Sequence, residues 1–105
     1  MTSNRIILTT TSSQAEARKI ARALIEKKLA ACVNIIPRIE SVYRWQGKVE
    51  TAREWLLVIK TSQKRAKAVE SAIKELHSYD LPECISIAID GGSKEYLKWL
   101  GKQVG

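Results

Sequence analysis

Side chains that could bind a metal ion gather in one short segment near residue 80. Four candidates lie within eight positions: His77, Asp80, Glu83 and Cys84. Imidazole, carboxylate and thiolate groups all bind metals, but this spacing matches no recognised motif. Glu83 and Cys84 should also point to opposite faces of a strand, because they are adjacent. His77 is therefore a candidate metal ligand, and the alternative is an imidazole that interacts with the unpaired carbonyls at a helix end.

A second set of polar and aromatic side chains could form a cleft for a small ligand where copies of the chain meet in an assembly. Its members are Tyr43, Trp45, Lys48, Glu50, Lys60, Tyr79 and Glu83. Lys60 ends one apolar run and Glu83 opens another, so the two charges could face each other between aromatic walls. Such a pocket suits a small anionic or zwitterionic ligand. Alternatively, these residues form the salt bridges and aromatic packing that hold an assembly together.

The chain lacks the sequence patterns of common catalytic sites. It has one histidine, no G-x-S-x-G, no glycine-rich phosphate loop and no H-E-x-x-H. The usual nucleophile, phosphate-binding and metalloprotease patterns are therefore absent, and the chain is predicted not to be an enzyme.

Length and composition indicate one domain. The 105 residues are 45% hydrophobic and 28% charged, which suits a single core over residues 1–105. No apolar run reaches the roughly 18 residues of a membrane helix, and the apolar segment in MTSNRIILTT is too short for a signal peptide. Cys32 and Cys84 show no C-x-x-C spacing and are expected to be free thiols. We expect a cytoplasmic protein without a membrane partner.

The net charge of +7 raises the question of a nucleic-acid partner. Many of the basic residues fall in two helical segments, mixed with glutamates, as is typical of solvated helix faces. RNA-recognition modules share the β-α-β-β-α-β order that this sequence predicts, but they stack bases on aromatic residues of the central strands. This chain has no phenylalanine, and its strand aromatics cluster near residues 43–45. No nucleic-acid partner is expected.

Hydrophobic periodicity predicts the elements that position these residues. β-Type runs cover residues 5–11, 31–45, 48–61 and 83–90. Apolar residues at three- and four-residue steps predict helices near 13–29 and 63–77, and a short C-terminal helix near 93–102. This β-α-β-β-α-β order predicts an α+β, ferredoxin-like sandwich, in which one antiparallel sheet carries two helices on one face.

The segment SVYRWQGKVE predicts a hairpin with its turn at residues 46–47. In that register Tyr43 faces Glu50. Glu40 then faces Arg53, an opposite-charge pair that favours this pairing.

This hairpin is too long for the body of the domain. A strand over residues 31–45 would be roughly 50 Å long, whereas a domain of this size is somewhat over about 30 Å across. The hairpin should project as an arm, although Pro37 or a bulge would bend or shorten it. The run WLLVI at residues 55–59 is apolar on both sides, and two helices cover only one. We expect other copies of the chain to cover the second sheet face and the arm; alternatively, the C-terminal helix folds back over the arm.

The segments LAACVNIIPRIESVYRWQGKVE, EWLLVIKT and YDLPE closely resemble the CutA divalent-cation tolerance family. The resemblance extends over nearly the whole chain. It implies a ferredoxin-like subunit in a homotrimer whose long hairpins interlock, similar to the trimers of PII signalling proteins. It also implies a response to metal ions, with copper or another divalent cation as the ligand.

The resemblance further implies a copper site, from which this chain departs. Family members that bind copper use a cysteine in the first strand and histidines just before a Pro-Tyr pair. Here Thr9 stands at the cysteine position, Leu76 precedes His77, and Ser78 replaces the proline. The missing thiolate and imidazole are the donors that favour copper. We therefore expect a trimeric, non-enzymatic scaffold for a metal or small ligand; a PII-like small-molecule sensor, and then an RNA-binding domain, are the alternatives.

Overall fold

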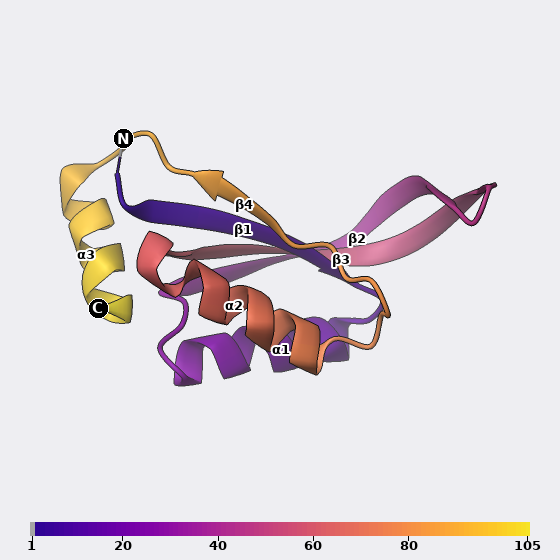
Figure 1. Cartoon of the computed structure of the whole chain (residues 1–105), viewed down its shortest axis with the longest axis horizontal. Coiled ribbons are helices and arrows are strands. Elements are labelled where there is room, and N and C mark those ends of the chain that lie inside the picture. Colours follow the sequence, from indigo (N-terminus) through magenta and orange to yellow (C-terminus); the bar gives the residue numbers. More distant parts are fainter. Residues whose placement is uncertain (1) are drawn as a thin grey trace.

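Four strands form one sheet, with two helices on one face and a third helix at one end (Figure 1). The computed structural model describes residues 2–105, so Met1, which the predicted domain includes, lies outside the described residues. The elements are β1 (Asn4–Thr11), α1 (Gln14–Glu26), β2 (Cys32–Trp45), β3 (Lys48–Ser62), α2 (Gln63–Leu76), β4 (Ile85–Ala88) and α3 (Lys94–Val104). The strand order is β2-β3-β1-β4 and every pairing is antiparallel. The predicted ferredoxin-like fold is confirmed.

Local hydrogen bonds explain where the first two helices begin and end. The hydroxyl of Ser13 accepts a hydrogen bond from the backbone N–H of Glu16 and caps α1. The hydroxyl of Ser62 accepts from the N–H of Arg65 and caps α2 in the same way. α1 ends at Glu26, earlier than predicted, because the chain turns at Lys28, where φ is 57°.

The last strand is shorter than the predicted run 83–90. β4 pairs only with residues 5–8 of β1. Two residues further along β1, the carbonyl of Thr10 accepts a hydrogen bond from the ring of His77. Pro82, in the connection between α2 and β4, has no N–H to donate to a neighbouring strand. The connection from α2 therefore reaches the sheet only at Ile85.

The hydrophobic core lies between the sheet and the two helices α1 and α2. Its fully buried large side chains are Ile7, Ile20, Leu24, Leu57, Ile59, Val69 and Ile73. Side chains alternate along a strand, so the neighbours of Ile7, Leu57 and Ile59 point to the opposite face.

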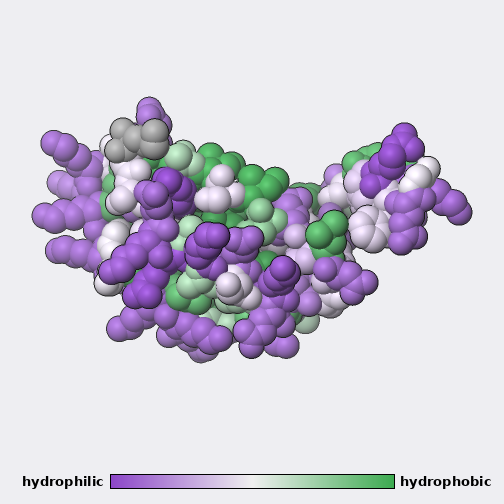
Figure 2. Space-filling model, in the orientation of Figure 1, coloured by the Kyte–Doolittle hydropathy of each residue, from purple (hydrophilic) through white to green (hydrophobic). Residues whose placement is uncertain are grey.

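We call that opposite face the open sheet face. Its apolar members are Ile6, Leu8, Ile36, Leu56, Val58, Ile85 and Ile87. Ile85 and Ile87 on β4 are 49% and 45% exposed. Figure 2 shows a band of hydrophobic atoms near β4, surrounded by hydrophilic ones. The prediction that the two helices cover only one side of the sheet is confirmed.

The hairpin of β2 and β3 projects beyond the body of the molecule (Figure 1). Its register is the predicted one, with Tyr43 opposite Glu50 and Glu40 opposite Arg53. The two turn residues, at positions 46 and 47, both have positive φ, 50° and 80°, as a type I′ turn requires. The longest dimension of the molecule is 44 Å, against 25 and 22 Å for the other two. The predicted arm is therefore present.

A bulge interrupts β2 between Ile36 and Ile39. Ile36 pairs with Leu56 and Ile39 with Glu54, so two residues of β2, Pro37 and Arg38, face one residue of β3. Arg38 has a φ of 55°, in the left-handed region. Pro37 and a bulge, which sequence reasoning treated as alternatives, thus occur at the same point.

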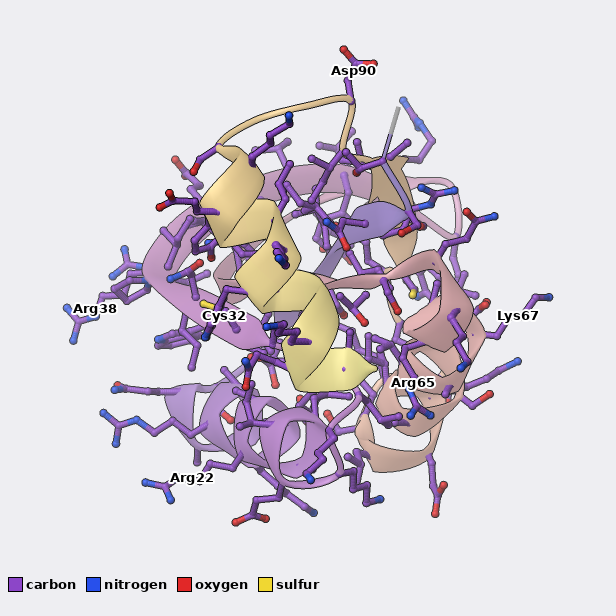
Figure 3. The ribbon with its side chains drawn as sticks, turned by 90° about the vertical axis from the view of Figure 1, so that its left-hand side faces the viewer. Arg22, Cys32, Arg38, Arg65, Lys67 and Asp90 are labelled. Atoms are coloured by element: carbon purple, nitrogen blue, oxygen red, sulfur yellow. The ribbon has the colours of Figure 1, made fainter. Side chains whose placement is uncertain are left out.

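The C-terminal helix does not fold back over the arm. α3 lies at the opposite end of the sheet from the hairpin tip (Figure 1). The side-chain amide of Asn4 donates to the carbonyl of Leu97, and Nε of Arg65 donates to the carbonyl of Val104. Figure 3 shows Arg65 beside the end of α3, whereas Arg22 and Lys67 point outward from α1 and α2. Leu100 and Val104 are buried, so α3 closes the far end of the core.

Among residues 2–105, none of the helices is both long enough and apolar enough to span a membrane.

Candidate functional site

A cavity of about 730 Å³ lies between the hairpin arm and the segment 79–83. Figure 1 shows this segment, part of the connection from α2 to β4, near the base of the arm. β2 contributes Tyr43 and Trp45 among others, β1 contributes Thr10 and β3 contributes Glu54. Figure 2 shows the surface hollowed between the body of the molecule and the hairpin tip. Its volume falls within the range of small-molecule sites.

Glu54 and Tyr79 form the central polar contact of this cavity. The phenol O–H of Tyr79 donates to Oε2 of Glu54 over 2.8 Å, and Glu54 is only 7% exposed. Burial, the hydrogen bond to Glu54 and the negative charge of Glu54 raise the pKa of Tyr79 from 10.0 to about 12. Tyr79 therefore stays protonated at neutral pH and donates a hydrogen bond to Glu54.

Ultraviolet titration of the tyrosines should show this contact. Of the three tyrosines, one should ionise near pH 12, because the phenolate of Tyr79 would face the carboxylate of Glu54. Since the pKa is raised in the folded state, its contribution to stability is complete below pH 10 and is lost as the pH rises toward 12. Glu54→Gln should lower this pKa, whereas Glu50→Gln, on the exposed arm, should not. Three tyrosines that ionise together near pH 10 would contradict the contact.

His77 holds the segment that carries Tyr79. Its Nε2–H donates to the carbonyl of Thr10 over 2.6 Å, and its Nδ1 accepts the backbone N–H of Tyr79 over 3.1 Å. A backbone N–H can only donate, so Nδ1 is unprotonated and the hydrogen is on Nε2. The rings of His77 and Tyr79 also pack together, with centroids 4.6 Å apart. The alternative to a metal role was that His77 interacts with the unpaired carbonyls at the end of its own helix. The carbonyl that its ring contacts belongs instead to β1.

These bonds bear on the predicted metal role of His77. Both ring nitrogens have backbone partners, and the side chain is buried. Thr9, at the family's cysteine position, is fully buried on the helix-covered side of β1. Within residues 2–105, no group of three or more His, Cys, Asp or Glu side chains is arranged to hold a metal ion. Metal binding by His77 therefore stays a prediction, and it would require the ring to give up a hydrogen bond.

The two neighbours Glu83 and Cys84 point in different directions, as predicted. Glu83 lines the cavity, whereas Cys84 packs against the core. Burial, followed by the negative charges of Glu70 and Glu83, raises the pKa of the Cys84 thiol. Since a thiolate is the form that binds metals, this cysteine is a poor donor at neutral pH.

The structure brings together four of the seven predicted cleft residues. Tyr43, Trp45, Tyr79 and Glu83 line the cavity, whereas the three others do not: Lys48, Glu50 and Lys60. Lys48 and Glu50 belong to the exposed part of the arm. Lys60 lies six residues from Glu54 along β3, about 20 Å away at 3.3 Å per residue, so within one chain it does not complete a pocket with Glu83.

Sequence reasoning missed Glu54 and Thr10. Glu54 offered a signal, because it is the charged residue that precedes the buried run of β3. Thr10 offered none, since its part depends on its carbonyl, which accepts the bond from His77. Asp80, considered only as a metal ligand, also lines the cavity.

Comparison with known proteins identifies relatives over nearly the full length. Residues 5–103 match the family model of the CutA1 divalent ion tolerance protein. The divalent-cation tolerance protein CutA of Thermus thermophilus is 44% identical over 100 residues, which cover 95% of this chain and 97% of that protein. The chloroplastic protein CutA of Arabidopsis thaliana is 44% identical over 95 residues, covering 90% of this chain. The chain spans only 52% of the length of that plant relative.

Solved structures show the same fold. The divalent cation tolerance protein of Thermus thermophilus superposes with a TM-score of 0.94 at 43% identity, covering 97% of this chain and 99% of that one. The periplasmic divalent cation tolerance protein CutA of Archaeoglobus fulgidus also gives 0.94, at 42% identity and with the same coverage. CutA of Xylella fastidiosa gives 0.96 at 38% identity, covering 98% of this chain and 99% of that one.

Proposed function

Because the chain belongs to the CutA1 divalent ion tolerance protein family, we propose that it acts in divalent-cation tolerance as a non-enzymatic, homotrimeric binding scaffold. The scaffold presents the cavity beside Glu54 and Tyr79 to a small ligand. In this proposal residues 1–105 form one domain, which works in the cytoplasm without a nucleic-acid partner. The chloroplastic and periplasmic relatives make cell fractionation the test of the location.

The observation that carries the proposal is the open sheet face. Ile85 and Ile87 expose almost half of their surface there, beside the half-buried Leu8 and Val58. A contiguous apolar area of this kind favours association, and a second copy is the partner that is always available. The face supports self-association, and the number three follows from the family resemblance.

The arm supports the same assembly. Val42 and Val49 are 66% and 65% exposed, and Trp45 is 44% exposed. An isolated two-stranded hairpin is marginally stable in water, so packing these side chains on a neighbouring chain would stabilise it. Light scattering coupled to size-exclusion chromatography tests the assembly. A mass of about 35 kDa, three times 11.8 kDa, is expected, and a stable 11.8 kDa species at low concentration would overturn it.

Metal binding is a separate part of the proposal, with copper or another divalent cation as the ligand and His77 as the candidate donor. Equilibrium dialysis against micromolar copper and zinc should show weakly retained metal, and His77→Asn should reduce it. Ser78→Ala, an adjacent exposed substitution, is the control. If native protein retains no metal, this part fails and the assembly is unaffected.

The cavity favours a second candidate, a PII-like small-molecule sensor. It combines apolar walls with a buried carboxylate, which is the usual composition of a small-ligand site. The RNA-binding alternative is disfavoured, because the open sheet face presents aliphatic side chains where RNA-recognition modules present aromatic ones. A thermal-shift screen with nucleotides tests the sensor.

A further inference from the structure

The charged side chains that line the cavity are all acidic. Glu54, Asp80 and Glu83 contribute carboxylates, and within residues 2–105 no lysine, arginine or histidine lines the cavity. Tyr79, the neighbour of Asp80 in the chain, is hydrogen-bonded to Glu54, so this segment meets the arm at its base. We call these three carboxylates the acidic end of the cavity. Glu54 is 7% exposed, and a buried carboxylate without a positive partner is costly.

The tip of the arm carries the opposite charge. We call residues 44–48 the arm tip; Arg44 and Lys48 are its only charged residues, and both are exposed. Neither has a carboxylate within ion-pair distance in the described part of the chain. Lys48 lies six residues from Glu54 along β3, about 20 Å away at 3.3 Å per residue. The arm tip therefore does not reach the acidic end of its own chain.

The acidic end is open only in a lone chain. The arm and the open sheet face expose Val42, Val49, Ile85 and Ile87, which neighbouring chains cover in the proposed trimer. The cavity lies beside the arm, so a neighbouring chain borders it as well. The positive partner that the acidic end lacks within its own chain is therefore to be found on a second copy.

The separation of charge along the arm favours one way for two arms to meet. Tip against tip would bring Arg44 and Lys48 of two copies together, and base against base would bring their carboxylates together. Like charges placed opposite each other disfavour both contacts. Tip against base pairs opposite charges, and it is the contact that electrostatic complementarity favours.

We propose that the arm tip of one copy lies against the acidic end of the next copy, where Arg44 and Lys48 supply the positive charges that this end lacks. The contact joins two different surfaces, and such a contact closes into a ring when rotation repeats it, whereas a two-fold contact gives a dimer. This inference rests on the proposed homotrimer and specifies which surfaces meet. The cavity is then bordered by two chains, with carboxylates from one and basic side chains from the other.

Reversal of the charges at the arm tip tests this contact in the assembled protein. Arg44→Glu combined with Lys48→Glu should lower the melting temperature by at least about 5 °C, measured by calorimetry at one protein concentration. On dilution, the mass of this variant by light scattering should fall to 11.8 kDa at a concentration at which the native protein is still trimeric.

Lys19→Glu combined with Lys67→Glu is the matched control. Both side chains are exposed on the helix side of the sheet, on α1 and α2, and their reversal changes the net charge by the same amount. Figure 3 shows Lys67 pointing outward. The control should leave mass and melting temperature unchanged. An unaffected tip variant, or equal effects of the two variants, overturns the proposal.

A second reversal separates loss of the contact from damage to the hairpin. Asp80→Lys combined with Glu83→Lys makes the acidic end positive through two exposed side chains, and it should weaken the trimer by itself. The chain with all four substitutions should regain at least half of the lost melting temperature, because opposite charges face each other again. Absence of recovery overturns the proposal. If Lys60→Glu restores the Asp80→Lys, Glu83→Lys chain and the tip substitutions do not, the neighbour's sheet face supplies the base, and the proposed contact is wrong.

The mass of the native protein, measured in the same buffers, separates this inference from the proposed function. A native trimer that tip reversal leaves unchanged overturns the contact between tip and acidic end, and the trimer stands. A native protein that is an 11.8 kDa monomer overturns both.

Discussion

An Ile87→Lys variant should be a monomer of 11.8 kDa by light scattering, whereas the native chain should be a trimer of about 35 kDa. Ile87 lies opposite Ile6 on the open sheet face and is 45% exposed. In a trimer this face is covered, and each lysine would be buried without a partner. An unpaired buried charge costs several kcal/mol per ion, and symmetry places one in every subunit.

Ile25→Lys is the matched control. Ile25 is also an isoleucine with similar exposure, 41%, but it lies on α1, on the helix side of the sheet. Its replacement should leave the mass at about 35 kDa. If both variants remain trimeric, or if both dissociate, the open sheet face is not the surface that joins the subunits.

Trp45→Ala should lower the melting temperature by roughly 10 °C, and Trp99→Ala by about 3 °C or less. In the single chain both indoles are 44% exposed, so burial within one chain does not distinguish them. Trp45 lies at the end of β2 on the arm, where a neighbouring chain should cover it. Trp99 packs against Tyr96 on α3, with ring centroids 5.6 Å apart, at the other end of the molecule.

The difference between the melting temperatures of these two variants measures how much the packing of Trp45 on a neighbouring chain contributes to stability. Loss of a fully buried tryptophan costs about 3–5 kcal/mol, whereas a half-exposed one costs much less. Melting followed by calorimetry at one protein concentration gives the comparison, because the stability of an oligomer depends on concentration. Equal shifts would count against an arm that packs between subunits.

Local pattern was sufficient to predict the arm and the open sheet face. The register of the hairpin depends on one glycine turn and on the pairing of Glu40 with Arg53, all within a short stretch of chain. The open sheet face followed from an apolar run on both sides of β3, which two helices cannot cover together.

The cavity could be predicted only in part, because its polar contacts join distant residues. Glu54 meets Tyr79 across 25 positions, and His77 meets Thr10 across 67. No periodic pattern records such contacts. Lys60 does not line this cavity of the single chain, so its place in a cleft between subunits stays a prediction.

Because of the extra residue at Pro37–Arg38, the odd- and even-numbered side chains of β2 exchange faces of the sheet. Before it, even-numbered side chains such as Ile36 lie on the side where chains should join. Beyond it, the odd-numbered Tyr43 and Trp45 take that side and line the same cavity as Glu54. Regular pairing through this point would turn both rings away from the carboxylate. One extra residue therefore lets the first half of β2 present Ile36, and its second half present Tyr43 and Trp45, on the same side of the sheet.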